Sequence, residues 1–149
     1  LASYPLMAII KLLGADYQEM RFDSFDEGCG VDLYTKIHLK YKNAIATAKV
    51  GLGVKSEGQL LISGTQGYIV VEAPWWKTQY FEVRHEQSDQ NEKFFSKFAT
   101  EGLRYELSDF ISMICGNEKK GFKLTPKESI TICRIIESFL SQRQTPTMV

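Results

Sequence analysis

The strongest constraint on the fold is the alternation of apolar and polar residues along 31–41, VDLYTKIHLKY. Ile37 and Leu39 fall on one side of an extended chain, and Lys36 and His38 fall on the other. A strand with one apolar and one polar side is typical of an antiparallel sheet that is covered on a single face. A slip of one residue would turn the apolar side chains to solvent, so the pattern also specifies the register of this strand.

Similar but weaker patterns predict about six strands, joined mostly by short turns. One turn is expected at KYKN, residues 40–43, and another at SGTQG, where Gly64 and Gly67 can adopt positive φ. The polar stretch 87–98 is predicted to be a loop. The strands are expected within 20–25, 31–41, 44–53, 60–62, 68–71 and 78–86.

Three segments have the period of a helix instead. In LASYPLMAIIKLLG, residues 1–14, apolar residues recur at i, i+3, i+4 and i+7, and Gly14 marks the end. The segment 103–115 has an apolar stripe of the same period. The segment 126–141 begins with a capping box, in which Thr125 is the N-cap and Glu128 is the third helical residue.

The order of helix, strands and two closing helices predicts an α+β fold in a single domain, 1–149. We expect a mainly antiparallel open sheet with the helices at 103–115 and 126–141 packed on one face. The first helix is amphipathic from its first residues, although the sequence has no initiator methionine and no polar lead-in.

Composition argues against several functional classes. The chain has 18 basic and 18 acidic residues, so it has no net charge to attract nucleic acid or an anionic membrane. No apolar run approaches the roughly 20 residues that span a bilayer. Cys29, Cys115 and Cys133 have neither C-x-x-C nor Cys/His metal spacing. They predict buried free thiols, a cytoplasmic location and no metal site.

The familiar catalytic signatures are absent from the sequence. The G-x-G within GLGVKSEG, residues 51–58, has its third glycine misplaced and is expected to form a turn after a strand. His38 shares a polar strand side with Lys36, and His85 lies near a strand end. An imidazole can transfer protons near neutral pH, so Lys36 and His38 are substrate-binding candidates. A solvated surface is the alternative.

Trp75 and Trp76 follow Pro74 at the exit of a predicted strand. Neighbouring residues of an extended segment point to opposite sides. We therefore expect one indole in the core and the other at a ligand wall or subunit contact, where tryptophan is enriched.

The order of these segments resembles the C-terminal domain of the Gfo/Idh/MocA oxidoreductases, the family of glucose–fructose oxidoreductase and inositol dehydrogenase. The resemblance covers nearly the whole chain. It rests on LASYPLMAIIKLLG, on a GT-x-G hairpin followed by the strand I-V-V, and on the helix start GL-x-x-E-x-x-x-F. Members of the family also have an N-terminal Rossmann domain with a dinucleotide fingerprint and a Glu-Lys-Pro motif, and this sequence contains neither.

The resemblance implies a parent oxidoreductase that uses NAD or NADP and acts on a sugar, polyol or related hydroxyl compound. The chain alone is expected to bind no dinucleotide and to be inactive. Tyr4 falls on the His/Tyr position of the family's D-x-G-x-[HY] motif, with Ala2 in place of the usual glycine. By resemblance, Tyr4 is the group that moves the hydroxyl proton, with its pKa lowered by the family's lysine, or it helps that group; the alternative is that it only caps the helix.

The resemblance also implies association, because the family's open sheet face commonly forms a subunit interface. We expect a homodimer or larger assembly through the sheet face that carries Tyr34 and His38. A non-catalytic dimerisation or ligand-binding module with the same fold is the alternative function.

Overall fold

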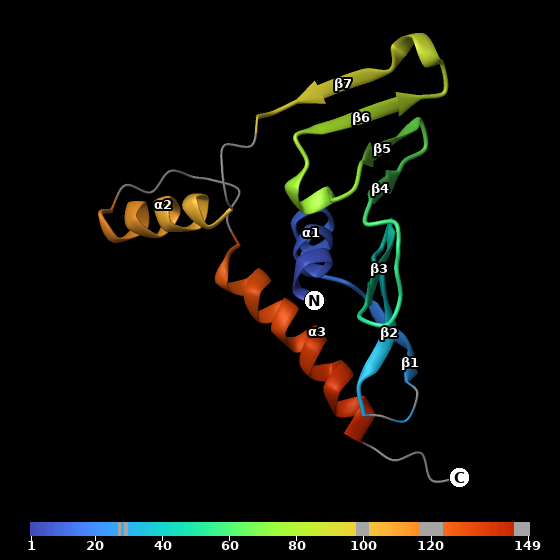
Figure 1. The fold of residues 1–149 in the computed structure, drawn as a ribbon, viewed down its shortest axis with the longest axis vertical. Helices are drawn as coiled ribbons and strands as arrows, with labels where there is room; N and C mark the ends of the chain where they lie inside the picture. The colour runs from blue at the N-terminus through green and yellow to red at the C-terminus, as the bar shows by residue number, and fades with distance from the viewer. Residues whose placement is uncertain (27, 29, 98–101, 117–123, 145–149) are drawn as a thin grey trace. The chain divides into compact units, whose positions relative to one another are not determined.

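The computed structural model describes the chain except for residues 27, 29, 98–101, 117–123 and 145–149 (Figure 1). All strands in the described part pair antiparallel, and they form a three-stranded sheet, sheet A, and a four-stranded sheet, sheet B. The elements are α1 (Ser3–Leu13), β1 (Glu19–Asp26), β2 (Asp32–Lys40), β3 (Ile45–Gly51), β4 (Leu60–Ser63), β5 (Gly67–Val71), η1 (Trp75–Lys77), β6 (Tyr80–His85), η2 (Ser88–Gln90), β7 (Glu92–Phe95), α2 (Leu103–Ile114) and α3 (Pro126–Gln144). The predicted α+β class is confirmed.

The chain divides into two compact units. The first unit comprises residues 1–55 and 122–149 and contains sheet A; the second comprises 56–121 and contains sheet B. The predicted single sheet of about six strands is therefore corrected to two sheets, with seven strands among the described residues.

Strand β7 lies in the stretch 87–98 that was predicted to be a loop. It pairs with β6, and the ring of Phe94 stacks on that of Phe81 with 4.8 Å between centroids. The prediction was wrong because a four-residue strand is too short for its alternation to stand out in a polar segment.

The alternation along β2 is confirmed. Thr35, Ile37 and Leu39 are buried, whereas Lys36 and His38 lie on the other face of sheet A. We call these the buried face and the polar face of sheet A.

Helices α1 and α3 cover the buried face of sheet A. Leu6 and Ile10 of α1, Leu39 of β2 and Ile135 of α3 are fully buried in one cluster. The periodic spacing of α1 aims its apolar stripe at the sheet, and α3 adds a second stripe beside it. The predicted packing of the last helix against the sheet is confirmed.

The capping box at the start of α3 is also confirmed, and it is linked to α1. The Glu128 N–H donates to the Thr125 hydroxyl over 3.3 Å, and the Thr125 N–H donates to the Glu128 carboxylate over 2.6 Å. Lys11 of α1 forms an ion pair with the same carboxylate at 3.0 Å. The Thr125 N–H, followed by Lys11, holds the pKa of Glu128 below its usual value.

The far end of α3 is held by Arg143. Its guanidinium donates to Asp32 over 2.9 Å and to Asp26 over 2.5 Å, so it joins the helix to the facing ends of β1 and β2. The Thr35 hydroxyl donates to the same Asp32 carboxylate over 2.7 Å. This network satisfies the buried hydroxyl of Thr35 in an otherwise apolar layer.

Helix α2 differs from the other two helices, because none of its described residues is buried. Its apolar stripe matches the sequence prediction. The prediction also expected this helix to pack on a sheet, and its exposed residues do not show such packing.

Glycine is required at the turn between β4 and β5. Gly67 has φ 156°, and a Cβ there would lie 2.3 Å from the carbonyl oxygen of Arg84. Its carbonyl accepts the Gly64 N–H over 2.8 Å, which closes the hairpin that SGTQG predicted. Of the two glycines expected to use positive φ, only Gly67 does.

Substitution of the capping box gives a stability test with a defined pH dependence. A carboxylate whose pKa is lowered by folding stabilises the fold above its unfolded value of 4.5, and this contribution is lost as the pH falls through the folded pKa. Glu128→Gln should lower the melting temperature at pH 7, and its difference from the native protein should shrink below pH 4.5. Thr125→Ala should cost about 1 kcal/mol.

The matched control is Glu137→Gln, an exposed position on the same helix. It should leave the pH profile of the melting temperature unchanged. A Glu128→Gln deficit that persists undiminished at pH 2 would contradict the electrostatic account.

Candidate functional site

Tyr4 lies in the first turn of α1 and is 55% exposed. The helix begins after Ala2 without a side-chain cap, so its start is held by packing, with Leu6 buried one turn further on. The Tyr4 phenol is therefore accessible to a group outside the unit. This exposure is compatible with contact to a substrate, the function that the sequence proposed for Tyr4.

A pocket of about 230 Å³ opens beside the start of the chain within the first unit. Its polar groups, Thr35 and Asp32, are bonded to each other, and Asp32 also accepts from Arg143. The remaining walls are mostly apolar, so the pocket suits an apolar group. It is lined by Leu1, Ala2, Val31, Asp32, Thr35, Ile37, Val50, Gly51, Leu52, Ile136, Phe139 and Leu140.

His38 is the centre of a network on the polar face of sheet A. Its Nε2 lies 3.0 Å from the Asp23 carboxylate, and its Nδ1 lies 3.1 Å from the Thr47 hydroxyl. Arg21 donates to the same Asp23 oxygen over 2.9 Å. The imidazole is thus oriented by one partner on each neighbouring strand, and the Thr47 hydroxyl can donate to Nδ1 or accept from it.

Lys36 lies on the same face, and its Nζ is 5.9 Å from the centroid of the Tyr34 ring. The register places it between Asp23 of β1 and Lys49 of β3. The structure thus brings Lys36, His38 and Tyr34 together on one face.

Tyr4 is separated from this face. Helix α1 packs on the buried face of sheet A through Leu6 and Ile10, whereas Lys36 and His38 point to the polar face. Sheet A lies between Tyr4 and the two residues of the polar face. The structure therefore does not bring Tyr4, Lys36 and His38 into one site.

Trp75 and Trp76 lie in the second unit, on the 3-10 helix η1 rather than on an extended segment. Their rings meet edge to face, with centroids 6.0 Å apart. The backbone N–H of Trp75 donates to the Gly58 carbonyl over 3.1 Å. The expectation of one core indole is corrected: Trp75 is half-buried and Trp76 is 49% exposed. The turn geometry lets the two rings contact each other, which an extended segment would prevent.

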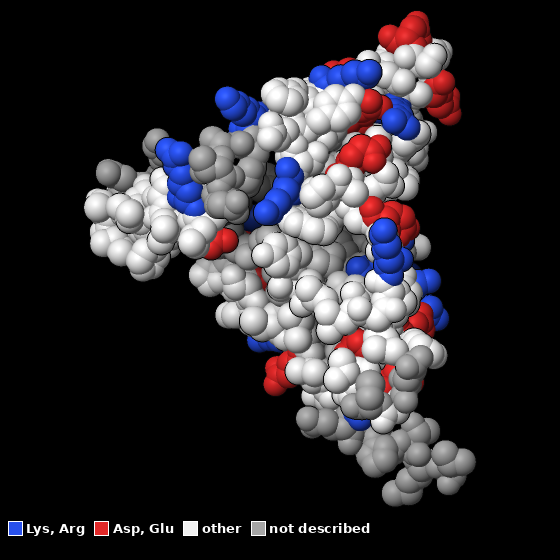
Figure 2. All heavy atoms as spheres, in the orientation of Figure 1, with Lys and Arg blue, Asp and Glu red and all other residues white. Residues whose placement is uncertain are grey.

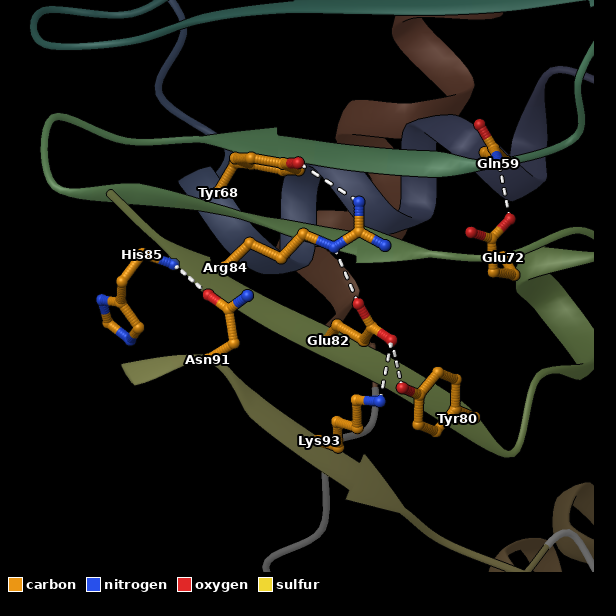
Figure 3. A network of polar contacts seen from close by, with 9 residues as sticks. All are labelled: Gln59, Tyr68, Glu72, Tyr80, Glu82, Arg84, His85, Asn91 and Lys93. Carbon is orange, nitrogen blue, oxygen red and sulfur yellow. Dashed lines mark hydrogen bonds and ion pairs between the residues drawn. The ribbon is translucent and has the colours of Figure 1, made fainter. Parts of the chain in front are cut away.

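A polar network that sequence reasoning missed covers one face of sheet B (Figure 3). Arg84 donates to Glu82 over 2.7 Å and to the Tyr68 hydroxyl over 3.2 Å. Tyr80 donates to Glu82, and Lys93 lies 4.0 Å from the same carboxylate. We call this the polar face of sheet B, formed by Tyr68, Tyr80, Glu82, Arg84 and Lys93.

The hydrogen bonds of this network shift its pKa values. The hydrogen bond from Tyr80, followed by that from Arg84, holds the pKa of Glu82 below its usual range. The same bond to Glu82 raises the pKa of Tyr80, because it stabilises the neutral phenol. The carboxylate thus remains ionised as the acceptor that joins the two side chains.

The alternation in 78–86 already placed Glu82 and Arg84 on one side of a strand. The missing information was the register, which puts Tyr68 opposite Arg84 and Lys93 opposite Glu82. Cross-strand partners of this kind are not encoded in local spacing.

Charge is mixed over the visible surface: Figure 2 shows acidic and basic side chains interspersed over the described residues. Within the described part of the chain, no group of three or more histidine, cysteine, aspartate or glutamate residues could hold a metal ion. In the same part, no helix combines the length and apolarity that crossing a membrane requires.

The G-x-G at residues 51–53 does not open a helix. Gly51 is the last residue of β3, Leu52 and Gly53 follow it, and the next element is the strand β4. A pyrophosphate site of the usual kind needs a helix start at this place. Cys115 and Cys133 are free and exposed, which corrects the expectation that they are buried; Cys29 lies outside the described residues.

Comparisons with known proteins show similarity to solved structures only. No protein-family model matches the sequence, and no curated protein matches it. A UDP-N-acetylglucosamine 3-dehydrogenase from Acidithiobacillus ferrooxidans superposes with a TM-score of 0.75 at 14% identity, over 95% of this chain and 45% of that one. A 3-ketoreductase from Actinomadura kijaniata, in complex with TDP-benzene and NADP, gives 0.65 at 15% identity, over 91% of this chain and 42% of that one.

These structures are oxidoreductases of the Gfo/Idh/MocA type, and this chain has the fold of part of them. It spans less than half of their length, which is consistent with their C-terminal domain. The resemblance predicted from the sequence is thereby confirmed at the level of the fold.

The polar face of sheet B gives a spectroscopic prediction. In the native protein, Tyr80 and Tyr41 should titrate above pH 10, Tyr41 because burial raises its pKa. Glu82→Gln removes the charged acceptor, so the pKa of Tyr80 should fall towards 10 while Tyr41 stays high. Ultraviolet titration near 295 nm measures this, and Tyr80→Phe identifies the affected tyrosine. Glu86→Gln, an exposed change nearby, should leave the curve unaltered.

Proposed function

We propose that this chain is the substrate-binding and self-associating part of an NAD(P)-dependent oxidoreductase that acts on a sugar, polyol or related hydroxyl compound. The observation that carries the proposal is the fold shared with such an enzyme over 95% of this chain at a TM-score of 0.75. One structural neighbour is a dehydrogenase of a nucleotide-linked sugar, and another is a ketoreductase seen with a nucleotide ligand and NADP. A nucleotide-linked sugar is therefore a substrate to test first.

The cofactor, NAD or NADP, is proposed to be held outside this chain, because the G-x-G at residues 51–53 ends a strand and does not open a helix that could bind a pyrophosphate. It supplies hydride transfer. This chain contributes a wall for the substrate and a phenol at the start of α1. Tyr4 is exposed there and can donate or accept the proton of a substrate hydroxyl or carbonyl oxygen.

The polar face of sheet A is the proposed surface for self-association. It combines the Tyr34 ring with the oriented imidazole of His38, and aromatic residues are enriched in such interfaces. Its separation from Tyr4 by sheet A favours an interface over a direct substrate site for Lys36 and His38. In the second unit, Trp76 is the more exposed indole and is proposed to contact substrate or partner, with Trp75 supporting it.

A cytoplasmic location is part of the proposal, since Cys115 and Cys133 are free thiols. The alternative function is a non-catalytic dimerisation or ligand-binding module of the same fold. The coding sequence upstream of Leu1 discriminates between the two. A strand–G-x-G-x-x-G–helix and a Glu-Lys-Pro motif there support the oxidoreductase; a natural start codon near Leu1 supports the module.

If Tyr4 transfers the proton, removal of its hydroxyl should lower the catalytic rate strongly. In the parent protein, Tyr4→Phe should lower kcat by roughly 10²-fold or more, because a positioned proton donor contributes about that much. Steady-state kinetics with a UDP- or TDP-linked sugar and NAD or NADP measures it. Tyr105→Phe, on an exposed helix position, is the matched control and should keep native activity. Unchanged kcat in Tyr4→Phe would remove Tyr4 from the mechanism.

The association proposal predicts a homodimer, the commonest symmetric assembly, that buries at least ~1,000 Å² through side chains of sheet A. Tyr34→Glu should shift light-scattering mass towards the monomer, because it places a charge in the contact. Lys42→Glu, an exposed change in the turn after β2, should leave the light-scattering mass unchanged. A clean monomer of the native protein at high concentration would contradict self-association.

A further inference from the structure

Strand β7 forms one edge of sheet B, and no described strand pairs with its outer side (Figure 1). The strand pairs with β6 in an unbroken register and contains no proline. Both of its phenylalanines are exposed, Phe94 at 41% and Phe95 at 73%. An edge strand with exposed apolar side chains is a template for pairing with another extended chain.

The backbone of β7 alternates between groups that point towards β6 and groups that point away from it. The Ser96 N–H donates to the Gln79 carbonyl over 2.8 Å, so these two residues form a hydrogen-bonded pair at the end of the ladder. Hydrogen-bonded and non-hydrogen-bonded pairs alternate along an antiparallel ladder. Phe94 therefore points its N–H and C=O towards β6, whereas Lys93 and Phe95 point theirs outwards. No backbone group of the described residues outside the strands bonds to these outward groups.

A lysine on an edge strand usually opposes pairing with another chain, because its charge would be buried in the contact. The Lys93 ammonium instead lies 4.0 Å from the Glu82 carboxylate of β6, as Figure 3 shows. This ion pair turns the side chain inwards, over the polar face of its own sheet. The outer backbone groups of β7 are therefore not shielded by Lys93.

Side-chain charge selects one register if β7 pairs with β7 of a second copy across a two-fold axis. Centring the axis on Lys93 places two ammonium groups directly opposite each other, which is destabilising. Centring it on Phe95 places Lys93 opposite Lys97 of the second copy, with the same result. Centring it on Phe94 places Lys93 opposite Phe95 of the second copy, so that each ammonium meets an aromatic ring.

We propose that two copies of this chain pair β7 with β7 in antiparallel orientation, centred on Phe94. Lys93 and Phe95 then exchange backbone hydrogen bonds with the second copy, and the two Phe94 residues form the non-hydrogen-bonded pair between them. Because the Phe94 ring already stacks on Phe81 at 4.8 Å, the contact continues an aromatic row from one sheet into the next. The contact does not use sheet A, so it is independent of the association proposed above.

Hydrogen exchange followed by NMR on the whole chain tests the contact residue by residue. A contact between strands of four residues is small and transient, so exchange is compared at about 20 µM and about 1 mM protein. The Lys93 and Phe95 amides should exchange at least ~10-fold more slowly at the higher concentration. The Phe94 amide, which points to β6, is the internal control and should exchange equally at both concentrations.

One matched pair of variants locates the contact. Phe95→Lys should abolish the concentration dependence, because it sets like charges opposite each other at an already exposed position. Leu61→Lys, an exposed change on β4 at the opposite edge of sheet B, should retain it. The concentration dependence should also persist in Tyr34→Glu, which carries its new charge on sheet A.

Crosslinking measures the register. With Cys29, Cys115 and Cys133 replaced by serine, Phe94→Cys should form a covalent dimer on mild oxidation, because a non-hydrogen-bonded pair brings its Cα atoms to about 4.5 Å. Leu61→Cys in the same background should remain monomeric. Equal crosslinking of the two variants would overturn the proposal.

Three exchange results would also overturn it. Free exchange of the Lys93 and Phe95 amides at both concentrations means that the edge stays open. Equal protection at both concentrations means that a segment of the same chain covers the edge. Loss of the concentration dependence in Tyr34→Glu means that the contact belongs to sheet A.

Discussion

The first unit depends on one apolar seam, in which α1 lies against both sheet A and α3. Leu6 and Ile10 of α1, Leu39 of β2 and Ile135 of α3 are all fully buried there. None of these elements could bury its apolar side alone: an eleven-residue helix is marginal in water, and a sheet with one apolar face needs a second layer to cover it. The seam therefore holds the strands, the helix start at Tyr4 and the pocket beside it in one rigid arrangement.

Charged contacts fix the direction of α3 across this seam. Glu128 closes the helix start and pairs with Lys11, while Arg143 joins the other end to Asp26 and Asp32. These ion pairs are partly exposed, so each contributes little to the free energy of unfolding. Because they lie at opposite ends of α3, these ion pairs favour one position of the helix along sheet A. Apolar contacts alone would tolerate a shift of the helix along its axis.

The two faces of sheet A have different consequences for function. The buried face positions the start of α1, where Tyr4 is exposed, and the polar face orients His38 between Asp23 and Thr47. The proposed proton-transferring group and the proposed association surface therefore lie on opposite sides of the same sheet. This separation is the physical basis for proposing catalysis on one side and contact between subunits on the other.

Local periodicity in the sequence determined most of the secondary structure, because helices and strands differ in the spacing of their apolar residues. It predicted the faces of β2, the capping box of Thr125 and Glu128, and the glycine turn at Gly67. Only the tertiary structure decided what depends on register and packing between distant segments. It divided the strands into two sheets, paired Tyr68 with Arg84 and separated Tyr4 from His38. These outcomes follow from contacts between residues far apart in the chain, which local spacing does not encode.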